Sequence, residues 1–310
     1  MVRYIGQRLS ALVPVMLLVS AVVFGIMHVL PGDPIHLMLA GAEAGSVTPE
    51  RMEQLRKTLG LDQPLYVQFT RFAANALRGD LGRSIRFESP VSQLVGEAAG
   101  YTFQLSIAGM AVALALGLPL GIIAALTENS WIDALCMFVA LLGVSMPLFW
   151  LGQVLIMGVA IRLQWLPAIS GDQTIGIILP ALTLGFISAG LISRLTRASL
   201  TEVLRDDFVR TARAKGLGER IVIVRHALQN ALIPVLTVVG LQFGGLLSGA
   251  VVTETVFSRP GLGTLIVKGI LWHDYPLIQG AVLLMAGSYV LVNLGVDVLY
   301  AWVDPRIHYA

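Results

Sequence analysis

The sequence carries little charge for its length. Only 13% of its 310 residues are Asp, Glu, Lys or Arg, compared with about 25% in soluble domains. Hydrophobic residues make up 56%, and the mean hydropathy is +0.78. Because so few charged residues cannot solvate the surface of a domain of this size, the composition predicts an integral membrane protein.

Cysteine and metal-binding patterns are also scarce. The single cysteine, Cys136, lies in an apolar stretch, can form no intrachain disulfide and is expected to be a small buried side chain. No cysteine–histidine spacing is typical of a zinc site. The net charge is only +2, and no basic stretch is interleaved with aromatic residues. These absences argue against a disulfide scaffold, a metal site and a nucleic-acid partner.

Catalytic motifs are absent as well. The sequence contains no G-x-x-x-x-G-K-[ST] loop for binding phosphates and no H-E-x-x-H metalloprotease motif. No serine, histidine and aspartate form a defensible catalytic set. We therefore expect a chain that is not an enzyme and has no cofactor of its own; if it drives active transport, a partner must hydrolyse ATP.

Six uncharged stretches are long enough to cross a membrane, since a spanning helix needs about 20 apolar residues. They are Leu9–Leu30, Tyr101–Leu126, Ala134–Ile161, Ile175–Ser193, Ala231–Thr253 and Tyr275–Val296. The first is longer than the apolar part of a signal peptide and lacks a cleavage site, so we expect it to be retained. Pro147 lies near the middle of the third and predicts a bend. The predicted fold class is all-α and polytopic, with six transmembrane helices.

The distribution of Lys and Arg predicts the orientation. The short connections on one side carry 11 of these residues and those on the other carry 3, which places both termini and residues 194–230 in the cytoplasm. The connection TENSWID (residues 127–133) is an exception, because it should be cytoplasmic but has two acidic residues and no basic one.

This topology divides the chain into three parts: residues 1–30, an extracytoplasmic domain at 31–100, and a five-helix core at 101–310. Thr48 and Pro49 are suited to begin a helix that ends at Gly60. A second helix is predicted from Leu65 to Leu77, stopping near Gly79. The domain between the first two spans is thus expected to be small and helical.

Residues 194–230 form a long basic insert between two spans. Its apolar residues Leu200, Leu204, Phe208 and Ala212 recur every four positions and predict one helical face, which Gly216 and Gly218 interrupt. The opposite side carries Arg205, Arg210, Arg213, Lys215, Arg220 and Arg225. The insert could lie on anionic lipid, dock in a groove of a cytoplasmic protein, or be a solvated loop. The glycine break favours docking, because a helix that lies on a surface benefits from continuity.

Within this insert, RTARAKG followed by RHALQNALIPV resembles the cytoplasmic loop of permease subunits of binding-protein-dependent ABC importers. The resemblance is to the B-type permease of the dipeptide, oligopeptide and nickel group, and it extends over essentially the whole chain. Further motifs in the order of that family are VLPGDP, LGLDQPLYVQF, GDLGRS, GVSMPLFWLG, LQWLPA, ILPALTLG, SRLTRAS, VFSRPGLG, DYPLIQ and DVLYAWVDPRI.

The resemblance implies a type I ABC importer permease fold in a bacterial inner membrane. It also implies that the insert is the coupling helix seated in a cleft of the ATPase, with the candidate residues Asp207, Arg210, Thr211, Ala212, Arg213, Ala214, Lys215 and Gly216. The family motif has Glu and Ala where this chain has Arg210 and Thr211, so a role for that glutamate does not transfer. Ala212, Gly216 and Leu228 match the motif.

The implied partners are a second, C-type permease, two cytoplasmic ABC ATPases that bind ATP and Mg, and an extracytoplasmic substrate-binding protein. The implied substrate is a small peptide, and nickel or a metal chelate is the alternative. His28, His36 and His273 all fall on the external side and are the residues that could serve nickel. A passive channel or membrane scaffold is a different class of function, which would need no surface for docking an ATPase.

Polar residues inside the spans are candidates to line a pathway, because they are costly in lipid. They are Ser145, Gln153, Gln242 and Ser248, together with Pro147 at the expected bend. Each could instead be satisfied by a neighbouring helix. Glycines four residues apart, Gly117 with Gly121, Gly240 with Gly244 and Gly245 with Gly249, could pack helices within one subunit. Residues 240–249 could instead line the interface with a second permease and the pathway between the two.

Overall fold

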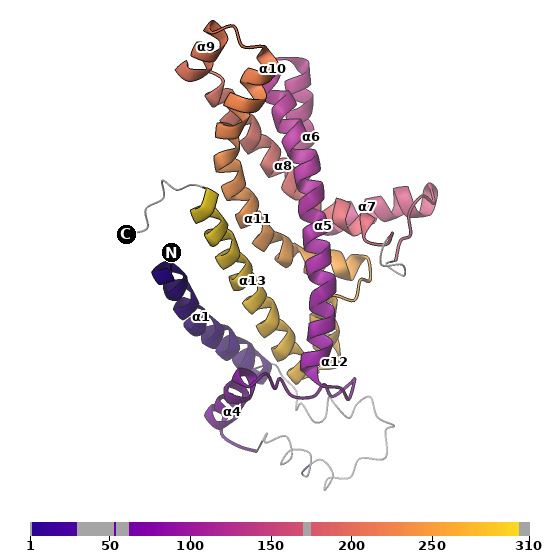
Figure 1. The fold of residues 1–310 in the computed structure, drawn as a ribbon. Helices are drawn as coiled ribbons and strands as arrows, with labels where there is room; N and C mark the ends of the chain where they lie inside the picture. Colours follow the sequence, from indigo (N-terminus) through magenta and orange to yellow (C-terminus); the bar gives the residue numbers. More distant parts are fainter. Residues whose placement is uncertain (1, 30–52, 54–61, 170–174, 304–310) are drawn as a thin grey trace. The chain divides into compact units, whose positions relative to one another are not determined.

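The computed structural model describes residues 2–29, 53, 62–169 and 175–303, and these residues form two compact units (Figure 1). The first unit comprises residues 1–101 and 260–291, and the second comprises residues 102–259 and 292–310. Within the described ranges, the β pairing consists of one isolated bridge, between Arg83 and Pro90. The predicted all-α class is therefore confirmed, whereas the division at residues 30 and 100 stays a prediction.

The first unit contains α1 (Val2–Val29), α4 (Leu65–Leu77), the start of α5 (Val91–Leu126), α12 (Leu262–Trp272) and most of α13 (Tyr275–Val303). Helix α4 has the predicted bounds, and the chain leaves it through Gly79 with a left-handed φ of 80°. Phe69 of α4 meets Phe24 of α1 edge to face, with ring centroids 5.6 Å apart. The helix predicted between Thr48 and Gly60 lies outside the described residues.

Helix α5 begins ten residues before the uncharged stretch from which it was predicted. Its first turns bury Val91, Val95 and Ala98 in a core completed by Leu262, Leu277 and Ala281. A search for uncharged stretches does not reveal this start, because Glu97 interrupts the stretch; Glu97 itself is exposed, while Val95 and Ala98 near it are buried. The apolar spacing of Val91, Val95 and Ala98 instead explains why the helix begins early.

The second unit contains the remainder of α5 and the chain from α6 to α11. The elements are α6 (Trp131–Ser145), α7 (Leu148–Leu155), the π-helical η1 (Ile156–Arg162), α8 (Ile178–Val203), α9 (Asp207–Ala214), α10 (Glu219–Ile221), the π-helical η2 (Val222–Ala227) and α11 (Leu228–Val256). The bend predicted at Pro147 is confirmed, because α6 and the α7–η1 segment meet at 108°.

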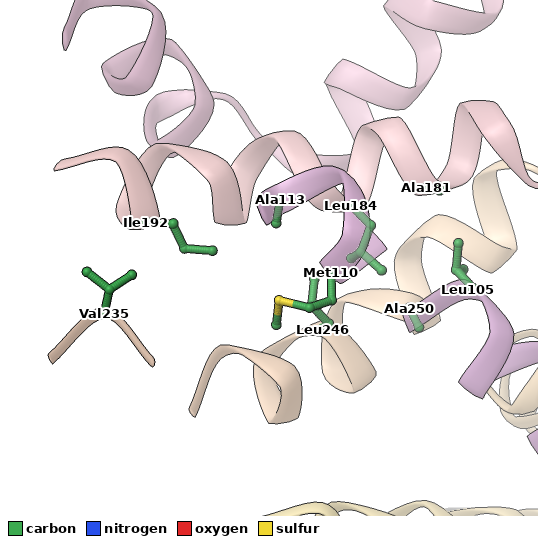
Figure 2. Close-up of a cluster of buried hydrophobic side chains, with 9 residues drawn as sticks. All are labelled: Leu105, Met110, Ala113, Ala181, Leu184, Ile192, Val235, Leu246 and Ala250. Carbon is green, nitrogen blue, oxygen red and sulfur yellow. The ribbon is translucent and has the colours of Figure 1, made fainter. Parts of the chain in front are cut away.

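Helix α8 is central to the core of the second unit, in which buried side chains of α5, α8 and α11 meet (Figure 2). They are Leu105, Met110, Ala113, Ala181, Leu184, Ile192, Val235, Leu246 and Ala250. Small residues allow α5 to approach α8 closely: a Cβ atom at Gly121 would lie 2.5 Å from the carbonyl oxygen of Ser193. The Gly117–Gly121 pair therefore packs helices within this chain.

Four helical segments in the described chain are long and apolar enough to cross a membrane, and the bent α6–α7 pair gives a fifth. The four are Val91–Leu126, Ile178–Val203, Glu219–Val256 and Tyr275–Val296. The first predicted span falls within α1, of which Val13–Gly25 forms a shorter apolar helix. The membrane class thus agrees with the structure, and the count of six spans stays a prediction.

Candidate coupling loop and translocation surface

The basic insert at residues 194–230 contains a short helix closed by a glycine turn. Helix α9 carries Asp207 in its first turn and Arg213 in its last, which suits the helix dipole. The backbone N–H of Gly216 donates to the carbonyl of Arg213 at 2.9 Å, and the φ of Gly216 is +78°. Gly216 therefore occupies the left-handed position that commonly ends a helix. Figure 1 shows α9 and α10 together at the end of the unit where α11 begins.

The predicted four-residue stripe is wrong at Phe208. Leu200 and Ala212 are buried, but Phe208 is 42% exposed and Val209 is completely buried in its place. The cause is a turn at residues 204–206 that ends α8 and starts α9 in a new register. The four-residue spacing assumed a single continuous helix, and after the turn the buried positions are Val209 and Ala212 instead.

Helix α9 is seated on a small apolar core of its own. Val209 and Ala212 pack there with residues from four other elements: Ala125, Leu200, Val222, Ala227 and Ala231. The Ser199 hydroxyl also donates to the carbonyl of Ala231 at 2.9 Å, joining α8 to α11. Because α9 is packed against the ends of α5, α8 and α11, it is positioned as part of the helical unit and not as a loose loop.

The coupling candidates share one exposed surface. Among them Ala212 is buried, and Asp207, Arg210, Thr211, Arg213, Ala214, Lys215 and Gly216 are exposed. The Arg213 guanidinium donates to both carboxylate oxygens of Glu219, at 2.6 and 3.1 Å. These hydrogen bonds raise the pKa of Arg213 above its usual range. One basic residue of this surface is therefore engaged in holding the glycine turn closed.

Both acidic residues of TENSWID pair with arginines of the insert. Glu128 contacts Arg205 at 2.7 Å, and Asp133 contacts Arg197 at 2.6 Å. The connection contains no basic residue, and the arginines that neutralise its two carboxylates come from residues 194–230. Its acidity is consequently compatible with a position on the same side as the insert.

The pathway candidates lie mainly on exposed faces. Ser145, Pro147, Gln153 and Ser248 are exposed, and Gln242 is half-buried. Within the described ranges, the four polar side chains of this set make no hydrogen bond to another residue. Among the described residues, no neighbouring helix satisfies these side chains, and their place in a pathway stays a prediction.

Helix α11 presents a continuous face away from its own core. The exposed positions recur every three or four residues: Thr237, Leu241, Gly245, Ser248, Val252 and Thr255. The exposed face of α6, in contrast, carries Leu135, Phe138 and Leu141. Large apolar side chains are suited to contact with lipid, whereas a face that carries hydroxyl groups and glycine can also pack against another protein or line a cavity. The two glycines of the Gly245–Gly249 pair differ in the space around them. Gly245 has room for a Cβ atom, whereas a Cβ atom at Gly249 would lie 2.8 Å from the Leu184 side chain.

A buried polar group at the end of α11 was missed by the sequence reasoning. Glu254 and Arg259 are 0% and 1% exposed. The Thr102 hydroxyl donates to Glu254 at 2.6 Å, and the Arg259 guanidinium donates to Gln104 at 3.2 Å. The signal present in the sequence is two charged residues directly after an apolar stretch, of which Arg259 lies in the motif VFSRPGLG and Glu254 precedes it.

A second buried carboxylate lies in the first unit. Asp274 accepts hydrogen bonds from the Ser84 hydroxyl at 2.5 Å and from the backbone N–H groups of Ile85 and Arg86 at 3.0 and 3.1 Å. Its other oxygen accepts from the N–H of Leu277 in the first turn of α13. The motifs GDLGRS and DYPLIQ, far apart in sequence, therefore meet at one aspartate.

The histidines do not form a metal site in the described chain. His273 is half-buried and has a left-handed φ of 54° at the end of α12. His36 and the side chain of His28 lie outside what the structure describes. Among the residues searched, no three His, Cys, Asp or Glu side chains are grouped to hold a metal ion.

Comparison with known proteins covers the full length of the chain. Residues 117–309 match the family "Binding-protein-dependent transport system inner membrane component", and residues 1–97 match its N-terminal region. The chain is 46% identical to the glutathione transport system permease protein GsiC of Escherichia coli O6:H1, over 100% of both chains. It is 45% identical to GsiC of Pectobacterium atrosepticum, again over 100% of both.

Solved structures share the fold at low identity. A chain of the MetNI methionine ABC transporter, in an inward-facing conformation, matches with a TM-score of 0.60 and 16% identity. The match covers 68% of the present chain and 97% of that one. An amino acid ABC transporter chain matches with a TM-score of 0.53, covering 70% of the present chain and 95% of its own length.

Proposed function

The chain belongs to the binding-protein-dependent inner membrane components, as a B-type permease subunit of the peptide ABC importers, and from this premise we propose that it forms half of a translocation pathway for small peptides. It is not itself an enzyme; in such transporters partner ATPases hydrolyse the ATP.

The main observation that supports this proposal is the exposed face of α11. Gly245 and Ser248 share that face with Leu241 and Val252, and with Thr237 and Thr255, whose hydroxyls donate to carbonyls of their own helix. Ser248 is therefore the side chain on this face with an unbonded hydroxyl in the described chain. Polar side chains at this depth face a protein interior or an aqueous cavity. A second permease, of the C-type, would cover the face and enclose the pathway, to which Ser145, Gln153 and Gln242 also contribute.

Helix α9 is the proposed contact with the ATPases. Its buried side chains fix it to α5, α8 and α11, so a movement of α9 must displace those helices. Two cytoplasmic ABC ATPases, binding ATP and Mg, would supply that movement, and alternating access would follow from the two states that nucleotide selects. Both termini are then cytoplasmic, in a bacterial inner membrane.

Glutathione is the first substrate to test. The relatives at 46% identity over the full length are named as glutathione permeases, and glutathione is a tripeptide within the proposed class. An external binding protein would deliver the peptide. Nickel or a metal chelate is the alternative within the same machinery, and the external histidines would then become the residues of interest.

Uptake separates these alternatives. Cells with and without this chain, and with its partner subunits present, are given labelled glutathione, labelled L-alanyl-L-alanine or radioactive nickel. Peptide uptake that requires both the chain and ATP supports the proposal. Uptake of nickel alone would replace the substrate class, and uptake that survives depletion of ATP would indicate a passive channel.

A further inference from the structure

Asp133 and Arg197 join two helices by a forked ion pair. The Nε of Arg197 donates to Oδ1 of Asp133 at 2.6 Å, and its Nη2 donates to Oδ2 at 2.7 Å. Asp133 lies in the first turn of α6, and Arg197 lies near the cytoplasmic end of α8. Two parallel hydrogen bonds fix the relative orientation of the groups as well as their separation.

The carboxylate is held in place by its own helix. Its side chain is 7% exposed, and the backbone N–H of Asn129 also donates to Oδ2 at 3.1 Å. The hydroxyl of Ser130 caps α6 by accepting from the N–H of Asp133 at 3.2 Å. The turn and the cap therefore fix the carboxylate relative to the start of α6, and α6 cannot shift against α8 at this end without breaking the two hydrogen bonds of the fork.

The pair stands between the coupling helix and the bend of the membrane segment. From Arg197, α8 continues to Val203 and the chain then turns into α9. From Asp133, α6 runs to the bend of 108° before α7. Along the way α6 remains close to α8, since a Cβ atom at Gly143 would lie 2.7 Å from the carbonyl oxygen of Phe186.

The second pair of this region differs in exposure and provides a control. Glu128 and Arg205 form a single contact at 2.7 Å, and their side chains are 32% and 67% exposed. An exposed pair of this kind contributes little to stability. It has the same charges and joins the same two segments, but it lacks the fork and the burial.

We propose that the Asp133–Arg197 fork is the link that carries movement of α9 into α6 and, through the bend at Pro147, into α7. The two side chains are positioning residues, and the inference rests on the function proposed above. The acidic character of TENSWID follows from it, because the connection must supply the carboxylate of the link. A break in the fork would leave ATP hydrolysis without full transport.

The test compares transport with hydrolysis in proteoliposomes that contain the complete transporter. Labelled glutathione and L-alanyl-L-alanine are the probes, and the quantity measured is peptide taken up per ATP hydrolysed. Asp133→Asn removes the charge, Arg197→Lys keeps the charge without the fork, and Glu128→Gln is the control. We expect this ratio to fall about fivefold or more in the first two variants, with assembly and hydrolysis retained, and to stay unchanged in the control.

A second measurement does not depend on the substrate. In a Cys136→Ala background, a cysteine replaces Ser248 and is labelled with an impermeant maleimide, with and without ATP and vanadate. We expect nucleotide to change the labelling when the fork is intact and to have no effect in Asp133→Asn or Arg197→Lys. A wild-type chain that responds to nucleotide but takes up neither peptide would contradict the proposed substrate class alone, and labelling would still decide the link.

Three results would overturn the link. The first is an unchanged ratio of uptake to hydrolysis in correctly assembled Asp133→Asn and Arg197→Lys transporters. The second is failure of both variants to assemble, which would make the fork a folding element. The third is an equal loss in Glu128→Gln, which would assign the effect to the charge of the connection as a whole. A wild-type chain with neither uptake nor a nucleotide response would contradict the proposed function, and the link with it.

Discussion

The Arg213 guanidinium and the Glu219 carboxylate form two hydrogen bonds across the left-handed turn at Gly216. The pair links the last turn of α9 to the first residue of α10. Its consequence is that basic residues of the same exposed surface have different roles. Arg213 closes the turn, whereas the neighbouring Lys215 extends beyond α9 and is exposed.

Substitutions at these residues should separate closure of the turn from docking. Lys215→Glu is expected to reduce the ATPase that co-purifies with the permease, because it reverses an exposed charge and leaves the turn intact. Arg213→Glu should reduce it too, by placing two carboxylates side by side. The exchange Arg213→Glu with Glu219→Arg restores the internal pair and should recover most of the ATPase. Equal recovery of ATPase with all these variants would favour contact of this surface with lipid.

Gly216 should tolerate asparagine but not proline. Its φ of +78° is closed to proline, whose ring fixes φ near −65°, while asparagine enters the left-handed region more readily than most residues. Gly216→Pro is expected to abolish uptake, and Gly216→Asn to retain most of it. Uptake is measured at matched amounts of inserted protein. Normal uptake by the proline variant would show that the shape of this turn is not needed for coupling.

Gly121 and Gly100 lie on the same helix and should respond in opposite ways to alanine. A Cβ atom at Gly121 would lie 2.5 Å from the Ser193 carbonyl oxygen, whereas nothing lies within 4 Å of one at Gly100. Gly121→Ala should cost about 1–3 kcal/mol through overpacking. Gly100→Ala should be neutral or gain up to about 1 kcal/mol in helix propensity. Melting temperatures of the purified variants in detergent measure the difference, and equal values would contradict the close approach of α5 to α8.

Loss of the Asp274 carboxylate should release the segment that it holds. Asp274→Ala removes the acceptor for Ser84, Ile85 and Arg86, and each unsatisfied donor costs about 1–3 kcal/mol. Faster cleavage by trypsin after Arg86 is expected, measured on the purified protein. Ser84→Ala removes one of these hydrogen bonds and should have a smaller effect. An unchanged cleavage rate in Asp274→Ala would mean that the segment is held by other contacts.

The features that sequence predicted well depend on local chemistry. The end of α4 was placed by the nearby Gly79, and the bend at Pro147 by the missing backbone donor. The break at Gly216 was also predicted from the glycine, which the structure places in a left-handed conformation. In each case the residue that determines the feature lies at the feature or within two residues of it.

The features that sequence missed depend on partners far along the chain. Thr102 and Glu254 are 152 residues apart, and Ser84 and Asp274 are 190 apart. No periodicity relates such positions: Ser84 and Asp274 were noted only as parts of family motifs, and Thr102 and Glu254 lie outside those motifs. The register of α9 was missed for a different reason, since a three-residue turn at 204–206 rotates every position after it. Phe208 was therefore expected to be buried, and it is exposed.

Arg259 is one of the largest fully buried side chains of the described residues, and its burial links two distant parts of the chain. Gln104, to which its guanidinium donates, precedes it by 155 residues. A guanidinium stranded in an apolar environment is costly, so the segment that follows α11 can be buried at this position only while α5 is packed beside it. The end of α11 and this part of α5 therefore depend on each other for their packing, however the rest of the unit is changed.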